Sequence, residues 1–126
     1  MMSIRRQTQT LFASTARTAT SVSSVLSAEE VVSSVFIIDV TAASATPSVV
    51  FSIEGKDPLS ESFYNIIDSA AITATGTTAI QVGMNIVAAA NVAANKILPE
   101  EYRITATHGD GDSITYTVGA VHMVQN

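Results

Sequence analysis

The fold class is decided by residues 102–120, which read YRITAT (102–107), HGDGD (108–112) and SITYTVGA (113–120). Apolar and polar residues alternate in the first and third of these runs, as in β-strands with one buried face. Threonine dominates the opposite faces. The glycines and aspartates between the runs predict a tight hairpin turn, because both residue types tolerate positive φ. Residues 98–124 are therefore expected to form a strand pair that lies against other structure.

Strand patterns also fill the middle of the chain. The strongest is Val31–Ala42, whose two faces are both apolar around Phe36, so we expect a central strand. A turn containing Pro47 follows, and the alternation resumes at Val49, which predicts a hairpin. Weaker strand signals occupy three further segments: 16–26, 63–68 and 70–82, the last as one strand or as two broken at Gly76.

The segment Met84–Lys96 departs from this pattern because it is rich in alanine, which favours a helix. It also holds three asparagines, which prefer turns to helix interiors. We expect an irregular crossing segment. With six to eight short strands and no βαβ rhythm, the chain is predicted to be all-β, an antiparallel β-sandwich or jelly-roll-like single domain over residues 28–126. Residues 1–27 are predicted to form an extended N-terminal arm.

Composition points to association. The chain has 126 residues, of which 47% are hydrophobic and only 13% charged. A surface with so few charges is poorly protected against association, so we expect contacts among copies. Cysteine is absent, which excludes disulfides and thiolate metal sites. No apolar run is long enough to cross a bilayer, and no signal-peptide core follows the first arginines.

Charge divides the chain unevenly. Residues 1–27 carry Arg5, Arg6 and Arg17 without an acidic residue, whereas residues 28–126 carry three cations and eleven acidic residues, a net charge of −8. An acidic body argues against nucleic-acid binding, which needs many cations along the phosphates. The three arginines are our candidate partner-binding residues, for an acidic partner or for the acidic body of another copy. The alternative is that they only keep a frayed terminus in solution.

Residues with catalytic or metal-binding chemistry are few. The turn His108–Asp112 offers two carboxylates to a hard cation but lacks the other ligands of a calcium loop, so we interpret it as a turn. His122 is in phase with the inward residues of the last strand, and we interpret it as a structural or surface residue. No nucleophile elbow and no phosphate-binding glycine loop occur. We predict no catalytic residue, no metal site and no cofactor, so the chain is not expected to be an enzyme.

The order of four motifs resembles a family of small tailed-bacteriophage structural proteins. The motifs are DVTA (39–42), I-x-GKDP (53–58), TATGTT (73–78) and LP-x-x-x-R (98–103), and the resemblance covers roughly residues 30–121. It implies a virion component with a β-sandwich body, most like a capsid decoration (cement) protein. The family commonly forms trimers that clamp neighbouring major capsid subunits, often through an N-terminal arm. The long Ser/Thr/Ala-rich start and the Met84–Lys96 segment depart from that pattern.

The resemblance and the composition lead to one expectation. The chain should be a non-enzymatic decoration protein on the exterior of a phage capsid, made in the host cytoplasm, with the major capsid protein as partner and a homotrimer as its assembly. The alternatives are another virion part, such as a tail, neck or head-fibre base protein, and a small carbohydrate-binding sandwich. A glycan binder usually exposes aromatic rings, and this chain has no tryptophan and only three tyrosines and four phenylalanines.

Overall fold

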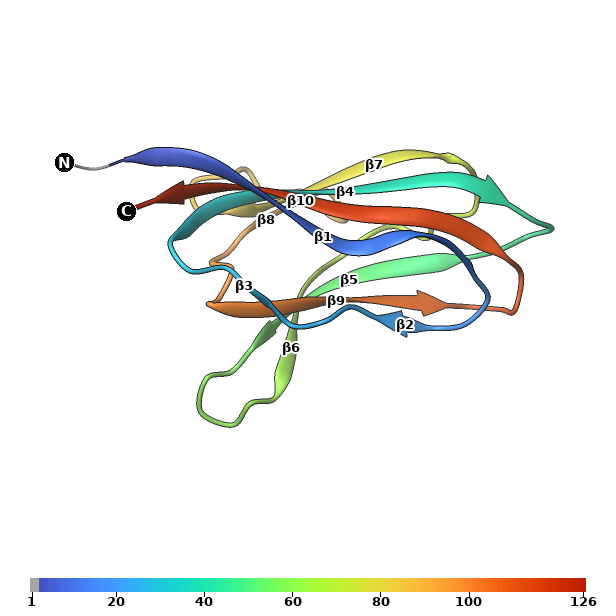
Figure 1. Ribbon diagram of the computed structural model, residues 1–126, viewed down its shortest axis with the longest axis horizontal. Helices are drawn as coiled ribbons and strands as arrows, with labels where there is room; N and C mark the ends of the chain where they lie inside the picture. The colour runs from blue at the N-terminus through green and yellow to red at the C-terminus, as the bar shows by residue number, and fades with distance from the viewer. Residues whose placement is uncertain (1–2) are drawn as a thin grey trace.

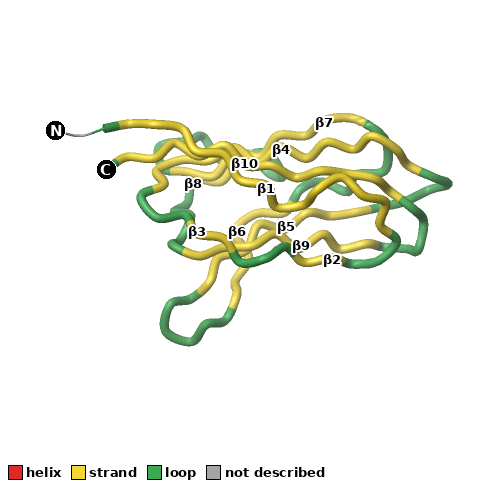
Figure 2. Tube along the Cα trace, in the orientation of Figure 1, coloured by secondary structure: helices red, strands yellow, loops and turns green. Residues whose placement is uncertain are grey.

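The computed structural model describes residues 3–126, which fold into two facing β-sheets and contain no helix (Figures 1 and 2). The prediction of an all-β sandwich is confirmed. Ten strands make up the sheets: β1 Ile4–Arg17, β2 Ser21–Val22, β3 Leu26–Ser27, β4 Val31–Ala43, β5 Val49–Lys56, β6 Phe63–Asp68, β7 Gly76–Gly83, β8 Ala93–Asn95, β9 Glu101–His108 and β10 Ile114–Gln125.

The strand order is that of a jelly roll. The first sheet has the order β1-β10-β4-β7-β8, and the second has β2-β9-β5-β6 with β3 also paired to β9. All pairs are antiparallel except β7 with β8. When β2 and β3 are taken as one interrupted strand and β8 as an addition, eight strands remain, wound as two packed Greek keys. The chain crosses repeatedly between the sheets, which ties them into one core.

The core lies between the inner faces of the two sheets, as the alternation predicted. Tyr102, Ile104 and Ala106 from β9, together with Tyr116 and Val118 from β10, are all buried. Aromatic rings meet edge to face at its centre: the ring centroids of Tyr116 and Phe51 on β5 lie 4.9 Å apart. Burying side chains of this size supplies roughly 1.5–3 kcal/mol each, the main favourable term for a chain without disulfides.

The two predicted hairpins, one at the turn 108–112 and one at the turn containing Pro47, are wrong. β9 lies in the second sheet and β10 in the first, and β4 and β5 are separated in the same way. Alternation reports which face of a strand is buried but not which sheet the strand joins. The two crossing loops meet at one end of the sandwich, where the backbone N–H of Thr46 donates to Asp112 Oδ2 at 3.1 Å and that of Gly109 to the Ser48 carbonyl at 2.8 Å.

The segment predicted as an N-terminal arm is extended, but most of it packs within the sandwich. Residues 4–17 form β1, which pairs with β10 along one edge of the first sheet. Leu11 and Phe12 of β1 are 8% and 6% exposed and belong to the core. β2 and β3 run along β9 in the other sheet. The start of β1 and the end of β10 project beyond the rest of the body (Figure 1). Met1 and Met2 lie outside the described residues.

The Met84–Lys96 segment is irregular, as predicted, and ends in the short strand β8. Asn85 and Asn91 adopt positive φ angles of 62° and 65°, which interrupts any helix. Of the segment 70–82, only the part from Gly76 onward is a strand. Ile72 forms an isolated bridge with Val49 in β5.

Candidate functional site

A buried polar cluster joins the two sheets at the end where the termini lie. His122 is fully buried, and its Nδ1 lies 2.6 Å from the hydroxyl of Ser34, which is 5% exposed. Its Nε2 lies 2.7 Å from Gln9 Oε1 and 3.1 Å from the Tyr102 hydroxyl. The Tyr102 hydroxyl also donates to Gln9 Oε1. The cluster therefore connects strands β1, β4 and β10 of the first sheet to β9 of the second.

The hydrogen bonds fix where the protons lie. The amide nitrogen of Gln9 donates to the Ser27 carbonyl at 2.8 Å, so its oxygen faces His122. That oxygen only accepts, which places a proton on Nε2 of His122 and leaves Nδ1 to accept from Ser34. Burial lowers the pKa of His122, so the imidazole is neutral at neutral pH.

A serine that donates to a histidine nitrogen is the arrangement that activates a nucleophile. Here, however, both side chains point between the sheets, where they are almost inaccessible. The ring of His122 packs edge to face against Phe36 and Tyr102, with ring centroids 6.0 and 5.8 Å away, so aromatic rings flank it on the core side. The cluster instead forms buried hydrogen bonds that hold the two sheets together. Sequence phase placed His122 on the inward face but could not identify its partners.

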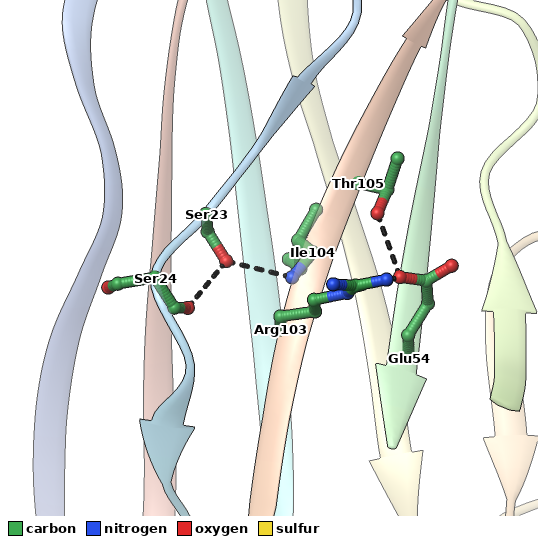
Figure 3. Close-up of polar contacts among 6 residues, drawn as sticks. All are labelled: Ser23, Ser24, Glu54, Arg103, Ile104 and Thr105. Atoms are coloured by element: carbon green, nitrogen blue, oxygen red, sulfur yellow. Dashed lines mark hydrogen bonds and ion pairs between the residues drawn. The ribbon is translucent and has the colours of Figure 1, made fainter. Parts of the chain in front are cut away.

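The outer face of the second sheet carries a second polar group (Figure 3). Arg103 Nε donates to Glu54 Oε1 at 2.8 Å, and the Thr105 hydroxyl donates to the same oxygen at 2.8 Å. The Arg103 guanidinium also lies 3.7 Å from the ring centroid of Phe63. Lys56 beside it approaches Glu61 at 3.5 Å. Pattern analysis missed this group, because cross-strand pairs depend on register.

Figure 3 also shows how the interrupted edge strand is held to β9. The Ser23 hydroxyl accepts the backbone N–H of Ile104 at 2.9 Å and donates to the Ser24 carbonyl at 2.9 Å. In the gap between β2 and β3, a side chain thus takes the place of one backbone ladder bond to β9. The edge of the second sheet is irregular as a result.

Of the three predicted partner-binding residues, Arg17 has a structural role. Its guanidinium donates to the carbonyls of Ala13, Thr15 and Tyr116 at 2.9, 3.2 and 3.2 Å. It also lies 5.0 Å from the ring centroid of Phe12 and 4.6 Å from that of Tyr116. These contacts hold the end of β1 against the core.

Arg5 and Arg6 lie at the start of β1, and both are exposed. The ion pairs found among residues 3–126 are made by Lys56 and Arg103, not by these two arginines. Arg5 borders a polar hollow of about 260 Å³ that Glu29 and Glu30 also line. The structure thus separates the predicted set into two exposed cations at one end of β1 and a third that is engaged at the other.

The two carboxylates of the acidic turn accept hydrogen bonds from backbone N–H groups of the loops at this end of the sandwich. Asp110 Oδ1 accepts the backbone N–H of Asp112 at 3.0 Å, and Asp112 in turn holds the loop at Thr46. His108 Nε2 lies 3.1 Å from the Tyr116 hydroxyl, and burial lowers the pKa of His108. Among residues 3–126, no three His, Asp or Glu side chains gather closely enough to hold a metal ion.

Exposed apolar side chains cluster in and beside the irregular segment before β8. Val87 is 90% exposed and Ile97 is 69% exposed. Between this segment and β6 lies a hollow of about 350 Å³, bordered by Ile66, Ile67 and residues 88–91 and 93–96. Its alanine-rich sequence was the only signal of this surface.

No protein-family model matches the chain, and no curated protein sequence matches it significantly. Residues 3–126 include no helix with the length and apolar character needed to cross a membrane.

Proposed function

We propose that this protein is a non-enzymatic structural protein of a tailed-phage virion that binds the outside of the capsid as a decoration (cement) protein. The supporting observation is that the four motifs of the phage resemblance fall on successive parts of one jelly roll: β4, the end of β5, the start of β7 and β9. Jelly rolls recur in viral structural proteins, but they also occur in lectins, so the fold alone does not assign the function.

The surface chemistry fits attachment by area. Several charged and polar side chains already bond to other side chains of the same chain, as in the Glu54–Arg103 pair and the His122 cluster. Much of the remaining surface consists of threonine, serine and alanine, which allow close approach. Each contact with the major capsid protein would be modest at roughly 25 cal/mol per Å² of apolar area, and a homotrimer would engage three sites at once.

The test is to locate the protein by cryo-electron microscopy of the phage that encodes it, and to measure binding of the purified chain to expanded empty heads. Deleting the first twenty residues is unsuitable, because Leu11 and Phe12 belong to the core. The double variant R5E/R6E should lower head occupancy, while R5K/R6K keeps the charge and should preserve it. Density at the tail or neck would favour another virion part, and no density in the virion would refute the proposal.

A carbohydrate-binding role receives less support. The rings of Phe36, Phe51, Tyr102 and Tyr116 are fully buried. Tyr64 is 47% exposed, but its ring lies against the backbone at Gly55. A sugar-binding platform needs an exposed ring face.

A further inference from the structure

Most sheet edges of this sandwich are closed against further pairing. Two carbonyls of β6 are already occupied: Lys96 Nζ donates to Ile66 O at 2.9 Å and Asn91 Nδ2 donates to Asp68 O at 3.0 Å. β8 spans three residues, and β2 and β3 span two residues each, with Ser23 between them. Short or side-chain-capped edges are how soluble proteins prevent unwanted strand addition.

The C-terminal half of β1 is closed as well. Its pairing with β10 shifts register between Thr10 and Phe12 and again between Phe12 and Thr15. The Arg17 guanidinium occupies the carbonyls of Ala13 and Thr15. Irregular register and occupied carbonyls leave no regular ladder for another strand.

The N-terminal half of β1 is different, because its register with β10 is unbroken from Ile4 to Thr10. Ser3 and Asn126 exchange two backbone hydrogen bonds, of 3.0 and 3.1 Å. In an antiparallel pair such residues alternate with residues whose N–H and C=O groups point away. Those of Ile4, Arg6 and Thr8 therefore face outward, and among residues 3–126 no hydrogen-bond partner lies beside them. Ile4 is 64% exposed, so this edge is open to solvent.

The charges beside this edge select the chemistry of a pairing strand. β1 carries Arg5 and Arg6 and no acidic residue. Arg6 lies next to a hollow of about 190 Å³ on the outer face of the first sheet, which Val35, Val121 and Met123 also border. A carboxylate opposite Arg6 forms a favourable cross-strand pair, and an apolar neighbour fits the hollow. A second copy of β1 would supply arginines and no carboxylate, so its charges do not complement this edge.

We propose that residues 4–10 of β1 are a strand-pairing site for an extended, carboxylate-bearing segment of another protein, which adds to the first sheet as an edge strand. Main-chain hydrogen bonds would supply affinity, and Arg6 would supply charge selectivity. This inference deepens the proposed function by specifying the chemistry of the partner strand. Its test uses no phage particle, so the two can fail separately.

The probes are two capped nine-residue peptides of alternating threonine and valine, one with two glutamates and the other with two lysines in their place. We would titrate each into the ¹⁵N-labelled full chain and record amide shifts and hydrogen exchange by NMR. We expect the glutamate peptide to shift and protect the amides of Ile4, Arg6 and Thr8. The lysine peptide should bind more weakly.

Three variants, T8P, T8V and R6E, probe the pairing site. T8P removes one outward N–H, a change that an edge strand tolerates, and should weaken glutamate-peptide binding by about tenfold. T8V keeps the N–H and should bind as the parent does. R6E leaves the backbone intact and should reverse the preference between the peptides, which keeps the test decisive if T8P does not fold.

Three results would overturn the proposal. The first is the absence of any shift at residues 4–10 with the glutamate peptide. The second is equal binding of both peptides. The third is protection of the same amides that rises with protein concentration in the absence of peptide, because that would place a second copy in the site.

Discussion

Replacing His122 with leucine tests whether the buried polar cluster around it stabilises the folded chain. The imidazole is fully buried, and its Nδ1 accepts a hydrogen bond from the Ser34 hydroxyl at 2.6 Å. Leucine has a similar volume, so H122L removes the hydrogen bonds without opening a large cavity. Gln9 and Tyr102 still bond to each other, which confines the loss to the serine hydroxyl.

The magnitude follows from that single orphaned group. A buried hydroxyl left without a partner costs roughly 1–3 kcal/mol, and the added apolar contact of leucine offsets part of this. We expect the free energy of unfolding at pH 7.5 to fall by about 1–2 kcal/mol. The double variant S34A/H122L removes both partners and should recover about 1 kcal/mol relative to H122L.

Lowering the pH should narrow the difference in free energy of unfolding between H122L and the parent. Burial lowers the pKa of His122 in the folded chain, so below the unfolded value near 6.5 the unfolded state binds a proton that the folded state does not. The contribution of the neutral histidine is complete above that value and is lost as the pH falls, with a slope of at most about 1.4 kcal/mol per pH unit. H122L lacks this slope but keeps the one from His108, whose pKa is also lowered.

Urea unfolding followed by far-ultraviolet circular dichroism at pH 7.5 and 5.5 measures these effects, since the chain has no tryptophan. The single variant S34A serves as the control, because it leaves the imidazole in place. Equal loss of stability on acidification in the parent and in H122L would refute the assignment of a neutral, buried His122. No recovery in S34A/H122L would refute the orphaned hydroxyl as the cause.

Three further substitutions test the contacts that hold the sandwich. G55A places a methyl group 2.6 Å from Pro99 Cγ and should lower the free energy of unfolding by about 1–3 kcal/mol. R17A removes three carbonyl contacts and two ring contacts, so it should cost about 1–2 kcal/mol and increase self-association measured by light scattering. R103M breaks a partly exposed pair with Glu54 and should cost no more than about 1 kcal/mol, an effect that shrinks in 1 M salt.

Each of these three predictions has an outcome that would contradict it. Unchanged stability in G55A would mean that the neighbouring rings yield easily. A monomeric R17A would show that its contacts do not protect the edge of β1. If R103M were equally destabilising at low and high salt, packing of the arginine stem would outweigh its charge.

Strand positions were largely predictable from the sequence, because alternation is a local property of a half-buried strand. The segment Phe63–Asp68 was predicted with the bounds that the structure has, and the inward residues of β9 and β10 were assigned correctly. The N-terminal segment was harder, because Leu11 and Phe12 are the only buried residues in fourteen and the bulges around them break the alternation.

The sequence by itself determined the all-β class, the inward phase of His122 and the basic character of residues 1–27. Only the tertiary structure decided that the glycine-aspartate run crosses between sheets, that Ser34 and Gln9 are the partners of His122, and that β1 is a sheet edge. The physical reason is that local periodicity specifies which side of a strand avoids water. Its neighbours depend on how all ten strands share one core, and that is settled by contacts between residues far apart in the chain.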